Sequence, residues 1–152
     1  VRVFWWNGTV AVQRGADIDG EAAGDWSGGA VALSGDGTIL AIGASSNAAA
    51  GSNAGHARVF WWNGTAAVWV QRGADIDGEV AWDYSGYSVA LSSDGATLAV
   101  GAYGNDATGS NAGHVRVFGW SGTVAVWVQR GADIDGEAAG DYSGWSMALS
   151  AD

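Results

Sequence analysis

The carboxylates of this chain are concentrated in a short loop that occurs three times. In the complete middle copy, acids alternate with other residues at Asp75, Asp77 and Glu79, and Asp83 follows. The corresponding acids in the other two copies are Asp17, Asp19, Glu21 and Asp25, and Asp133, Asp135, Glu137 and Asp141. Oxygen ligands at alternating positions are typical of calcium-binding loops. The spacing therefore makes all of these acids candidate calcium ligands.

A structural role for the same carboxylates is the interpretation that we favour. Gly78 is the fourth residue counted from Asp75, whereas the calcium loop of helix–loop–helix proteins requires glycine at the sixth position. Aspartate side chains also accept hydrogen bonds from backbone N–H groups in turns. We therefore expect these acids to cap the connection between one sheet and the next, and Asp83 in particular to fix a turn. Calcium binding stays open as the second interpretation.

The histidines are not expected to hold a metal ion. His56 and His114 occupy matching places, each before an arginine-containing strand. Zinc sites are usually built from several cysteines and histidines, and this chain has no cysteine and one histidine per complete repeat. We therefore expect each imidazole to bond a neighbouring turn. Three arginines at matching places are expected to pair with the acidic loops: Arg14, Arg72 and Arg130.

No set of residues typical of an active site is visible. The sequence contains neither a serine–histidine–acid set that can be argued from spacing nor a phosphate-binding loop. An active site is normally one asymmetric constellation, whereas the acids of this chain recur in every repeat. We therefore predict that the protein is not an enzyme and has no catalytic residues. We also expect no cofactor, unless the loops bind calcium.

Composition excludes several other classes of protein. The chain has 152 residues, among them 26 glycines and no proline, and its formal net charge is −10. Such acidity disfavours binding to nucleic acids and to anionic membrane surfaces. No apolar run reaches the roughly 18 residues that a membrane-spanning helix needs. High apolar content with few charges argues against disorder.

The loops are positioned by a repeat of 58 residues that reads as four strands. The units are residues 1–56, 57–114 and a truncated third unit, 115–152, which we treat as one domain. In the middle unit the predicted strands are residues 57–62, 66–71, 87–92 and 97–102. Asn63-Gly64 and Asp94-Gly95 separate strands as hairpin turns, since these residues tolerate positive φ. No window has a helical period, so we expect almost no helix.

The predicted strands give each sheet one bulky and one small face. Val89 and Leu91 alternate with Ala90, and Leu98 and Val100 alternate with Ala99. Both faces are buried only when the bulky face of one sheet meets the small face of the next, which is a head-to-tail arrangement. We therefore predict an all-β chain and a β-propeller of four-stranded blades, with about 2.6 repeats per chain. A β-solenoid is less favoured because its rungs are usually about 20–30 residues long.

The repeat resembles the FG-GAP repeats of integrin-α-type propellers. The resemblance rests on residues 113–118, residues 140–149 and the segment 92–102, which ends in Gly-Ala. It implies an extracellular or cell-surface propeller that binds proteins or glycans without catalysis. Calcium-binding members carry an acid-rich loop in one blade hairpin. The corresponding turn here, Ser92-Ser93-Asp94-Gly95 or Ser34-Gly35-Asp36-Gly37, is too short and too poor in carboxylates to surround a calcium ion.

The strand count leaves an incomplete blade at each end of the repeat array. The hairpin of residues 1–13 supplies two strands and residues 145–150 a single one, so we expect copies of the chain to complete each other. Two chains would close a six-bladed ring and three a nine-bladed one, and the homodimer is preferred because propellers commonly have about 4–8 blades. The function that follows is a non-catalytic, self-assembling scaffold that presents loops to a protein or glycan. A calcium-stabilised adhesion propeller is the alternative.

Two further patterns favour packing and turns over binding and modification. The strand tryptophans could form carbohydrate platforms, but aromatic side chains on strands usually pack between sheets, so we expect Trp69 and Trp127 to belong to the core. Asn7-Gly8-Thr9 and Asn63-Gly64-Thr65 are formal glycosylation sequons. Both also read as hairpin turns, which explains them without modification.

Overall fold

Antiparallel strands make up the regular structure of residues 1–150, the part of the chain that the computed structural model describes, and no helix occurs in this range. The strands are β1 (Phe4–Trp6), β2 (Ala11–Gln13), β3 (Ala30–Leu33), β4 (Ile39–Ala44), β5 (His56–Asn63), β6 (Val68–Gln71), β7 (Ile76–Asp77), β8 (Ser88–Leu91), β9 (Thr97–Ala102), β10 (His114–Ser121), β11 (Val126–Gln129) and β12 (Ile134–Asp135). The all-β prediction is confirmed.

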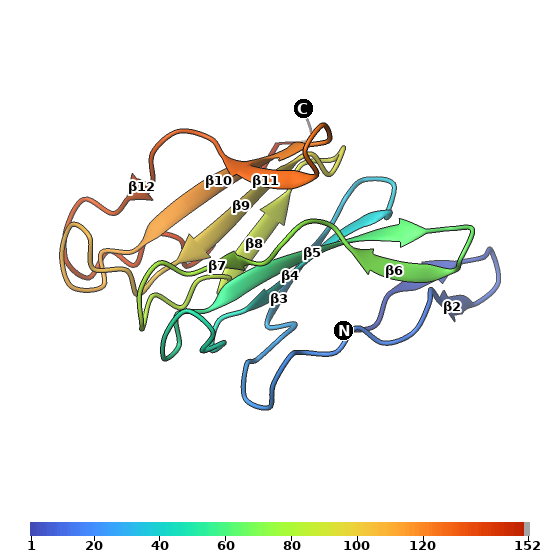
Figure 1. Ribbon diagram of the computed structural model, residues 1–152, viewed down its shortest axis with the longest axis horizontal. Helices are drawn as coiled ribbons and strands as arrows, with labels where there is room; N and C mark the ends of the chain where they lie inside the picture. Colours follow the sequence, from blue (N-terminus) through green and yellow to red (C-terminus); the bar gives the residue numbers. More distant parts are fainter. Residues whose placement is uncertain (151–152) are drawn as a thin grey trace.

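The strands form two sheets of the same topology and one separate hairpin. The first sheet has the order β3-β4-β5-β6, and the second has the order β8-β9-β10-β11. Strand β7 pairs with the start of β5, and β12 pairs with the start of β10. The hairpin β1-β2 lies beyond the first sheet, on the side away from the second (Figure 1). Each sheet is thus a meander in which neighbours in sequence are neighbours in space.

In the middle unit, strand positions agree with the sequence prediction except in the acidic loop. The strand predicted at residues 97–102 is β9, and the one predicted at 57–62 lies within β5. Strands β7 and β12 were not predicted from the sequence. These two-residue strands form because Ile76 pairs with Ala57 and Ile134 pairs with Val115. That pairing depends on a strand of the preceding sheet, which the loop sequence alone does not specify.

Hairpin turns lie at the predicted places and are closed by polar side chains. The turn after β5 differs in detail, because Asn63 pairs with Val68 and the residue with positive φ is Ala67 (53°), in place of Asn63 or Gly64. Asn63 Oδ1 accepts hydrogen bonds from the backbone N–H groups of Thr65 and Ala66, both at 3.1 Å. Asn7 Oδ1 does the same for Thr9 and Val10, both at 2.9 Å. The asparagine side chains of both sequons therefore have a structural role in their turns.

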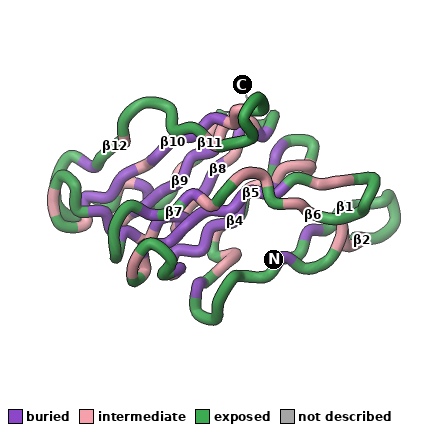
Figure 2. Tube along the Cα trace, in the orientation of Figure 1, coloured by how far each residue is buried: buried purple, intermediate pink, exposed green. Residues whose placement is uncertain are grey.

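The two sheets stack with a bulky face against a small face, as the strand alternation predicts. The second sheet contributes large side chains to the shared buried cluster: Val89, Leu98, Val100 and Phe118. The first sheet contributes a flatter surface that includes Ala41, Ala57 and Val59. Close approach also requires Gly43, because a Cβ there would collide with the carbonyl oxygen of Gly86 in the connection to β8. The buried positions follow the central strands of both sheets (Figure 2).

The same contact is repeated between the first sheet and the N-terminal hairpin. Leu40, Ile42 and Phe60 form the bulky face of the first sheet, and they pack against Val3 and Ile18. In the repeat, Val3 corresponds to Val59 and Ile18 to Ile76. One junction is therefore built twice in one chain, from equivalent residues.

The strand predicted at residues 145–150 is absent, which corrects the sequence analysis. These residues have no strand hydrogen-bonding pattern. The chain instead turns at Trp145, whose N–H donates to the Tyr142 carbonyl at 3.0 Å. A strand forms only when a neighbouring strand supplies backbone partners. Within residues 1–150, no third sheet provides an adjacent strand at this place.

The stacking predicts a large loss of stability when its centre is emptied. Leu98 is fully buried in the cluster between the sheets, so Leu98→Ala should lower the free energy of unfolding by about 2–5 kcal/mol. Urea unfolding monitored by tryptophan fluorescence measures the difference. Val124→Ala, at a 63% exposed turn position, is the control and should change stability by less than about 0.5 kcal/mol. Equal effects of the two substitutions would contradict the assigned core.

Candidate functional site

The histidines lie at the first positions of the two longest strands, where the acidic loops meet the sheets. His56 begins β5 and is paired with Asp77 of β7, and His114 begins β10 and is paired with Asp135 of β12. Their side chains are 1% and 0% exposed. Neither Nδ1 atom has a hydrogen-bond partner. The expected bond from each imidazole to a neighbouring turn is therefore not formed at Nδ1.

Carboxylates from two successive loops surround the first histidine. Nδ1 of His56 lies 3.8 Å from Glu21 Oε2 and 3.8 Å from Asp75 Oδ2. Asp77 Oδ1 is 3.9 Å from the same nitrogen. Glu21 belongs to the connection before the first sheet, whereas the two aspartates belong to the connection after it. The sheet thus brings together acids that are far apart in the sequence.

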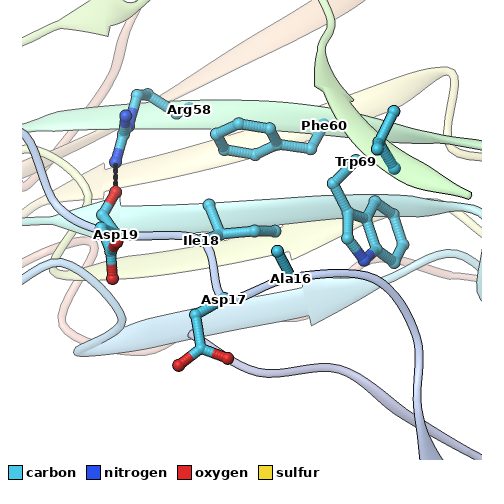
Figure 3. A pocket seen from close by; sticks show the side chains of 8 residues that line it. Ala16, Asp17, Ile18, Asp19, Arg58, Phe60 and Trp69 are labelled. Carbon is cyan, nitrogen blue, oxygen red and sulfur yellow. Dashed lines mark hydrogen bonds between the residues drawn. The ribbon is translucent and has the colours of Figure 1, made fainter.

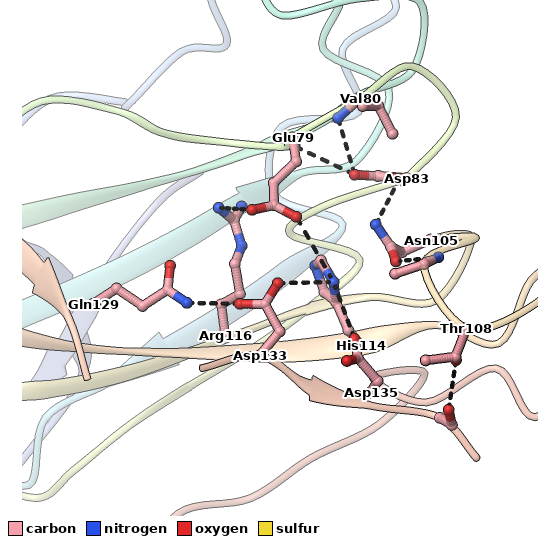
Figure 4. Close-up of polar contacts among 12 residues, drawn as sticks. Glu79, Val80, Asp83, Asn105, Thr108, His114, Arg116, Gln129, Asp133 and Asp135 are labelled. Carbon is pink, nitrogen blue, oxygen red and sulfur yellow. Dashed lines mark hydrogen bonds and ion pairs between the residues drawn. The ribbon is translucent and has the colours of Figure 1, made fainter. Parts of the chain in front are cut away.

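The second histidine repeats this arrangement with the next set of acids (Figure 4). Nδ1 of His114 lies 3.7 Å from Asp133 Oδ2 and 4.0 Å from both Glu79 Oε2 and Asp135 Oδ1. Glu79 and Asp133 again come from the connections before and after the sheet. Within residues 1–150, two groups of three such side chains converge within 4.8 Å, and they are Glu21-His56-Asp75 and Glu79-His114-Asp133. We call these the histidine–carboxylate clusters.

Each cluster has polar neighbours that orient its carboxylates. Gln71 Nε2 donates to Asp75 Oδ1 at 2.6 Å, which leaves Oδ2 facing His56. Nη1 of Arg58 lies 3.9 Å from Glu21 Oε1, while Oε2 faces His56. In the second cluster Gln129 and Arg116 have the same roles for Asp133 and Glu79. The repeat therefore fixes the direction of these oxygens.

Asp83 fixes a turn, as predicted. It is 1% exposed, and its Oδ2 accepts from the N–H groups of Glu79 and Val80 at 3.3 and 3.1 Å. Its Oδ1 accepts from Asn105 Nδ2 at 3.2 Å. Asp25 accepts from Ala22 N–H, and Asp141 from Ala138 N–H. This last acid of each loop caps backbone amides, in agreement with the favoured interpretation.

The candidate calcium ligands of one loop do not converge on a single site. In the middle loop, Asp75 and Asp77 face His56, Glu79 faces His114, and Asp83 caps the turn. In the first loop, Asp17 accepts from Gln13 Nε2 at 2.7 Å and Glu21 faces His56, whereas Asp19 is exposed. Glu137 of the third loop is exposed. The geometry groups acids across repeats, and sequence spacing within a loop gave no signal of this grouping.

The predicted pairing of Arg14, Arg72 and Arg130 with the acidic loops is wrong. Arg14 Nη1 donates to the Gly37 carbonyl at 2.8 Å, and Arg72 Nη1 donates to the Gly95 carbonyl at 3.0 Å. Arg72 also lies over the ring of Trp120, 4.6 Å from its centroid, and burial lowers its pKa. Arg130 Nη1 lies 3.4 Å from Thr97 Oγ1. These arginines hold hairpin turns, and the acid-facing arginines are Arg58 and Arg116.

A groove of about 350 Å³ is lined by Arg58, the arginine that faces Glu21 of the first cluster (Figure 3). Phe60 and Trp69 form one wall, and Ile18 with its neighbours forms the other. Arg58 Nη2 closes one end by donating to the Asp19 carbonyl at 2.7 Å. Trp69 Nε1 is satisfied by the Arg14 carbonyl at 2.8 Å, and Trp127 Nε1 by the Arg72 carbonyl at 2.9 Å. Trp69 and Trp127 therefore have the expected packing role.

Other aromatic side chains are exposed, contrary to the expectation that strand tryptophans are buried. Trp5, Trp6 and Trp61 are exposed in the single chain. A second group follows the turn-fixing aspartates, in which Trp26, Tyr84 and Tyr142 have φ values of 58°, 55° and 52°. A bulky residue rarely adopts this left-handed conformation, which often marks a functional position. Each connection thus places one aromatic ring at an equivalent surface position.

Comparison with known proteins assigns the central segment to a family. A family model described as "FG-GAP repeat" matches residues 76–118. This segment of the chain is therefore similar to an FG-GAP repeat. The match begins in β7 and ends within β10, so it includes β8, β9 and the connections that join β8 to β9 and β9 to β10. No curated protein matches the chain.

The short hairpin turns within the two sheets use their single acid to close the turn. Asp94 Oδ1 accepts from Ser92 Oγ at 2.6 Å and from Ala96 N–H at 2.9 Å. Asp36 Oδ1 accepts in the same way from Ser34 Oγ and Thr38 N–H. The serine hydroxyl, followed by the backbone N–H, holds the pKa of both carboxyls below its ordinary value.

These two turns predict a specific loss of stability in acid. Because their folded-state pKa is lowered, the two carboxylates stabilise the fold above the ordinary value of 3.8, and this contribution is lost as pH falls through the folded pKa. An Asp36→Asn/Asp94→Asn variant should be less stable near neutral pH and lose less stability on going to about pH 3. Urea midpoints at both pH values measure this. Asp19→Asn changes an exposed acid and is the control, so its stability should depend on pH as that of the wild type does. If the double variant lost as much stability in acid as the wild type, the stabilising role of Asp36 and Asp94 would be contradicted.

Proposed function

We propose that this protein is a non-catalytic, self-assembling β-propeller scaffold that presents a row of aromatic loops to a glycan partner. The FG-GAP repeat supports a propeller-type binding module, and such repeats are typical of extracellular and cell-surface proteins. Among residues 1–150, no helix has the length and apolar character needed to cross a membrane. Because FG-GAP repeats are typical of extracellular and cell-surface proteins, we propose that the function lies outside the cell or at its surface.

The main support for self-assembly is an exposed bulky face on the N-terminal hairpin. Phe4, Phe60 and Phe118 are equivalent in the repeat, but Phe4 is 51% exposed whereas Phe60 and Phe118 are 8% and 7% exposed. Within the chain, each of the two covered phenylalanines packs against the small face of the preceding sheet or hairpin. Phe4 has the same chemistry and has no such face to cover it among residues 1–150.

The matching uncovered face is at the other end of the chain. Ile134 is equivalent to Ile76, which is buried against the second sheet, but Ile134 is 58% exposed. The small face around it belongs to β10 and β12, and it presents the half-buried Val115 and Val117. The chain therefore carries both halves of one contact at opposite ends, and a second copy is the occupant that fits both.

A closed ring follows if each chain contributes three blade positions. Residues 145–150 would then gain a neighbouring strand from the β1-β2 hairpin of the next copy. A homodimer would have six blades, which we prefer, and a trimer would have nine; propellers commonly have about 4–8. Closure also covers open strand edges, which otherwise promote aggregation.

The mass of the particle in solution tests the assembly. Size-exclusion chromatography with light scattering should give twice the chain mass for the wild type. Ile134→Asp places a charge in the contact and should yield monomers or disordered aggregates. Val124→Asp, at an exposed turn outside the contact, should remain dimeric. A dispersed wild-type monomer would refute self-assembly, and a trimer would replace the six-bladed ring.

Glycan recognition is supported by the aromatic loops. Trp26 and Tyr142 are exposed, and Tyr84 is half-buried and stacks on Tyr103 with a centroid distance of 5.1 Å. An aromatic ring offers a flat apolar face and, in tyrosine, a polar tip. Rings at equivalent positions suit a repeating partner such as a polysaccharide.

A glycan array on the assembled protein tests this part of the proposal. We expect binding to a defined set of oligosaccharides. Trp26→Ala and Tyr142→Ala should each weaken it by about tenfold or more, as for loss of an aromatic anchor. Trp61→Ala, an exposed tryptophan on a different surface element, is the matched control and should bind normally. Wild-type binding by the Trp26 and Tyr142 variants would contradict this recognition surface, as would a negative array for an assembled protein.

A further inference from the structure

We propose that the two histidine–carboxylate clusters are binding sites for divalent transition-metal ions of the zinc class, one ion at Glu21, His56 and Asp75 and one at Glu79, His114 and Asp133. The sequence argued against zinc because each repeat has only one histidine. The structure changes this conclusion because the other ligands come from neighbouring connections. Each site is contained in a single chain, so the inference does not depend on self-assembly.

A buried imidazole without a hydrogen bond is the first observation. His56 and His114 are almost completely buried, and Nδ1 of each lacks a partner, as does Nε2 of His114. Burying a polar nitrogen without a bond is unfavourable by roughly 1–3 kcal/mol. The fold repeats this arrangement in both sheets. Coordination of an ion by Nδ1 would remove the cost.

The distances fit a shared ion better than direct hydrogen bonds. The Nδ1–oxygen separations of 3.7–4.0 Å exceed the range of a hydrogen bond. Two ligands about 2.1 Å from a tetrahedral ion lie about 3.4 Å apart. The carboxylate side chains are 25–44% exposed, and shortening these nitrogen–oxygen separations by roughly 0.3–0.6 Å would bring each oxygen to the separation that two ligands of one ion have. The exposed carboxylates also leave a path for the ion.

The charge of each cluster matches a divalent cation. Around His56, the carboxylates of Glu21, Asp75 and Asp77 are opposed by the single guanidinium of Arg58. If the imidazole is neutral, three carboxylates and one guanidinium give the group a net charge of −2. The same sum holds around His114 with Glu79, Asp133, Asp135 and Arg116.

The ligand set favours zinc over calcium. Calcium takes six to eight oxygens, whereas zinc is typically bound by about four ligands that include imidazole nitrogen and carboxylate oxygen. Bonds from an outer neighbour to a ligating group are typical of metal sites, and Gln71 and Gln129 supply them at 2.6 Å. We assign these glutamines as positioning residues, because each donates to the carboxylate oxygen that faces away from the histidine and to a carbonyl of its own loop, Gly73 or Gly131.

The predicted role of the ions is to join successive connections. The connection between the two sheets gives Asp75 to the first site and Glu79 to the second. Ions at both sites would hold this segment at two points and attach it to the sheet on either side. Metal binding should therefore raise stability without creating an active site.

Metal titration of the chelator-treated, dialysed wild-type protein tests the proposal. Isothermal calorimetry with zinc should give two ions per chain, and cobalt should give a visible absorption band at the same stoichiometry. Zinc should also raise the thermal unfolding midpoint. His56→Gln and His114→Gln should each leave one ion per chain. Gln71→Ala should keep both ions but weaken one site by roughly 10–100-fold.

Controls separate the proposal from a structural role for the histidines. If the histidine variants fail to fold, Glu21→Gln changes a half-exposed ligand and should still remove one ion per chain. Asp106→Asn removes an exposed acid outside both clusters and should keep two. The proposal is wrong if the wild type binds no zinc, or if Glu21→Gln and both histidine variants retain two ions. A midpoint that rises with calcium and not with zinc would also overturn it, and would favour calcium loops.

Discussion

The fold depends on one packing constraint, which is that the bulky face of each sheet must lie against the small face of the preceding one. Phe118 and Leu98 need the space left by Ala41 and Ala57, and Phe60 and Leu40 need the space beside Val3. Because protein interiors are close-packed, neither face can be hidden against a copy of itself without voids or overlap. The contact is therefore directional, and it sets the order in which the sheets follow one another.

This directional stacking explains why the polar groups of different repeats meet. Once the sheets are in place, the connection before a sheet and the connection after it both pass the first residue of its third strand. That residue is His56 in one sheet and His114 in the other, and each faces carboxylates from both connections. The turn-fixing Asp83 and its equivalents hold the same connections in shape. The polar clusters are thus a consequence of the apolar packing, and they occur once per sheet.

The same constraint connects the structure to the proposed function. A head-to-tail contact leaves one unmatched face at each end, and here the exposed Phe4 and Ile134 mark them. An assembly that satisfies both faces also repeats every loop around the particle. Aromatic rings such as Trp26 would then be presented many times, which suits a repeating ligand better than a single small molecule.

The sequence by itself determined the strands of the two four-stranded meanders, their faces and the places of their turns, because these depend on local alternation and on residues such as Asn63 and Asp94 that act within a few positions. It also identified Asp83 as a turn residue and supported the FG-GAP resemblance, which the match at residues 76–118 confirms. Only the tertiary structure decided which side chains of different repeats lie next to one another. It grouped Glu21 with His56 and directed Arg72 to a hairpin turn and Trp120. It also left residues 145–150 without strand structure. All of these features depend on contacts between different repeats. Because the repeats have nearly the same sequence, the sequence does not specify which repeat contacts which.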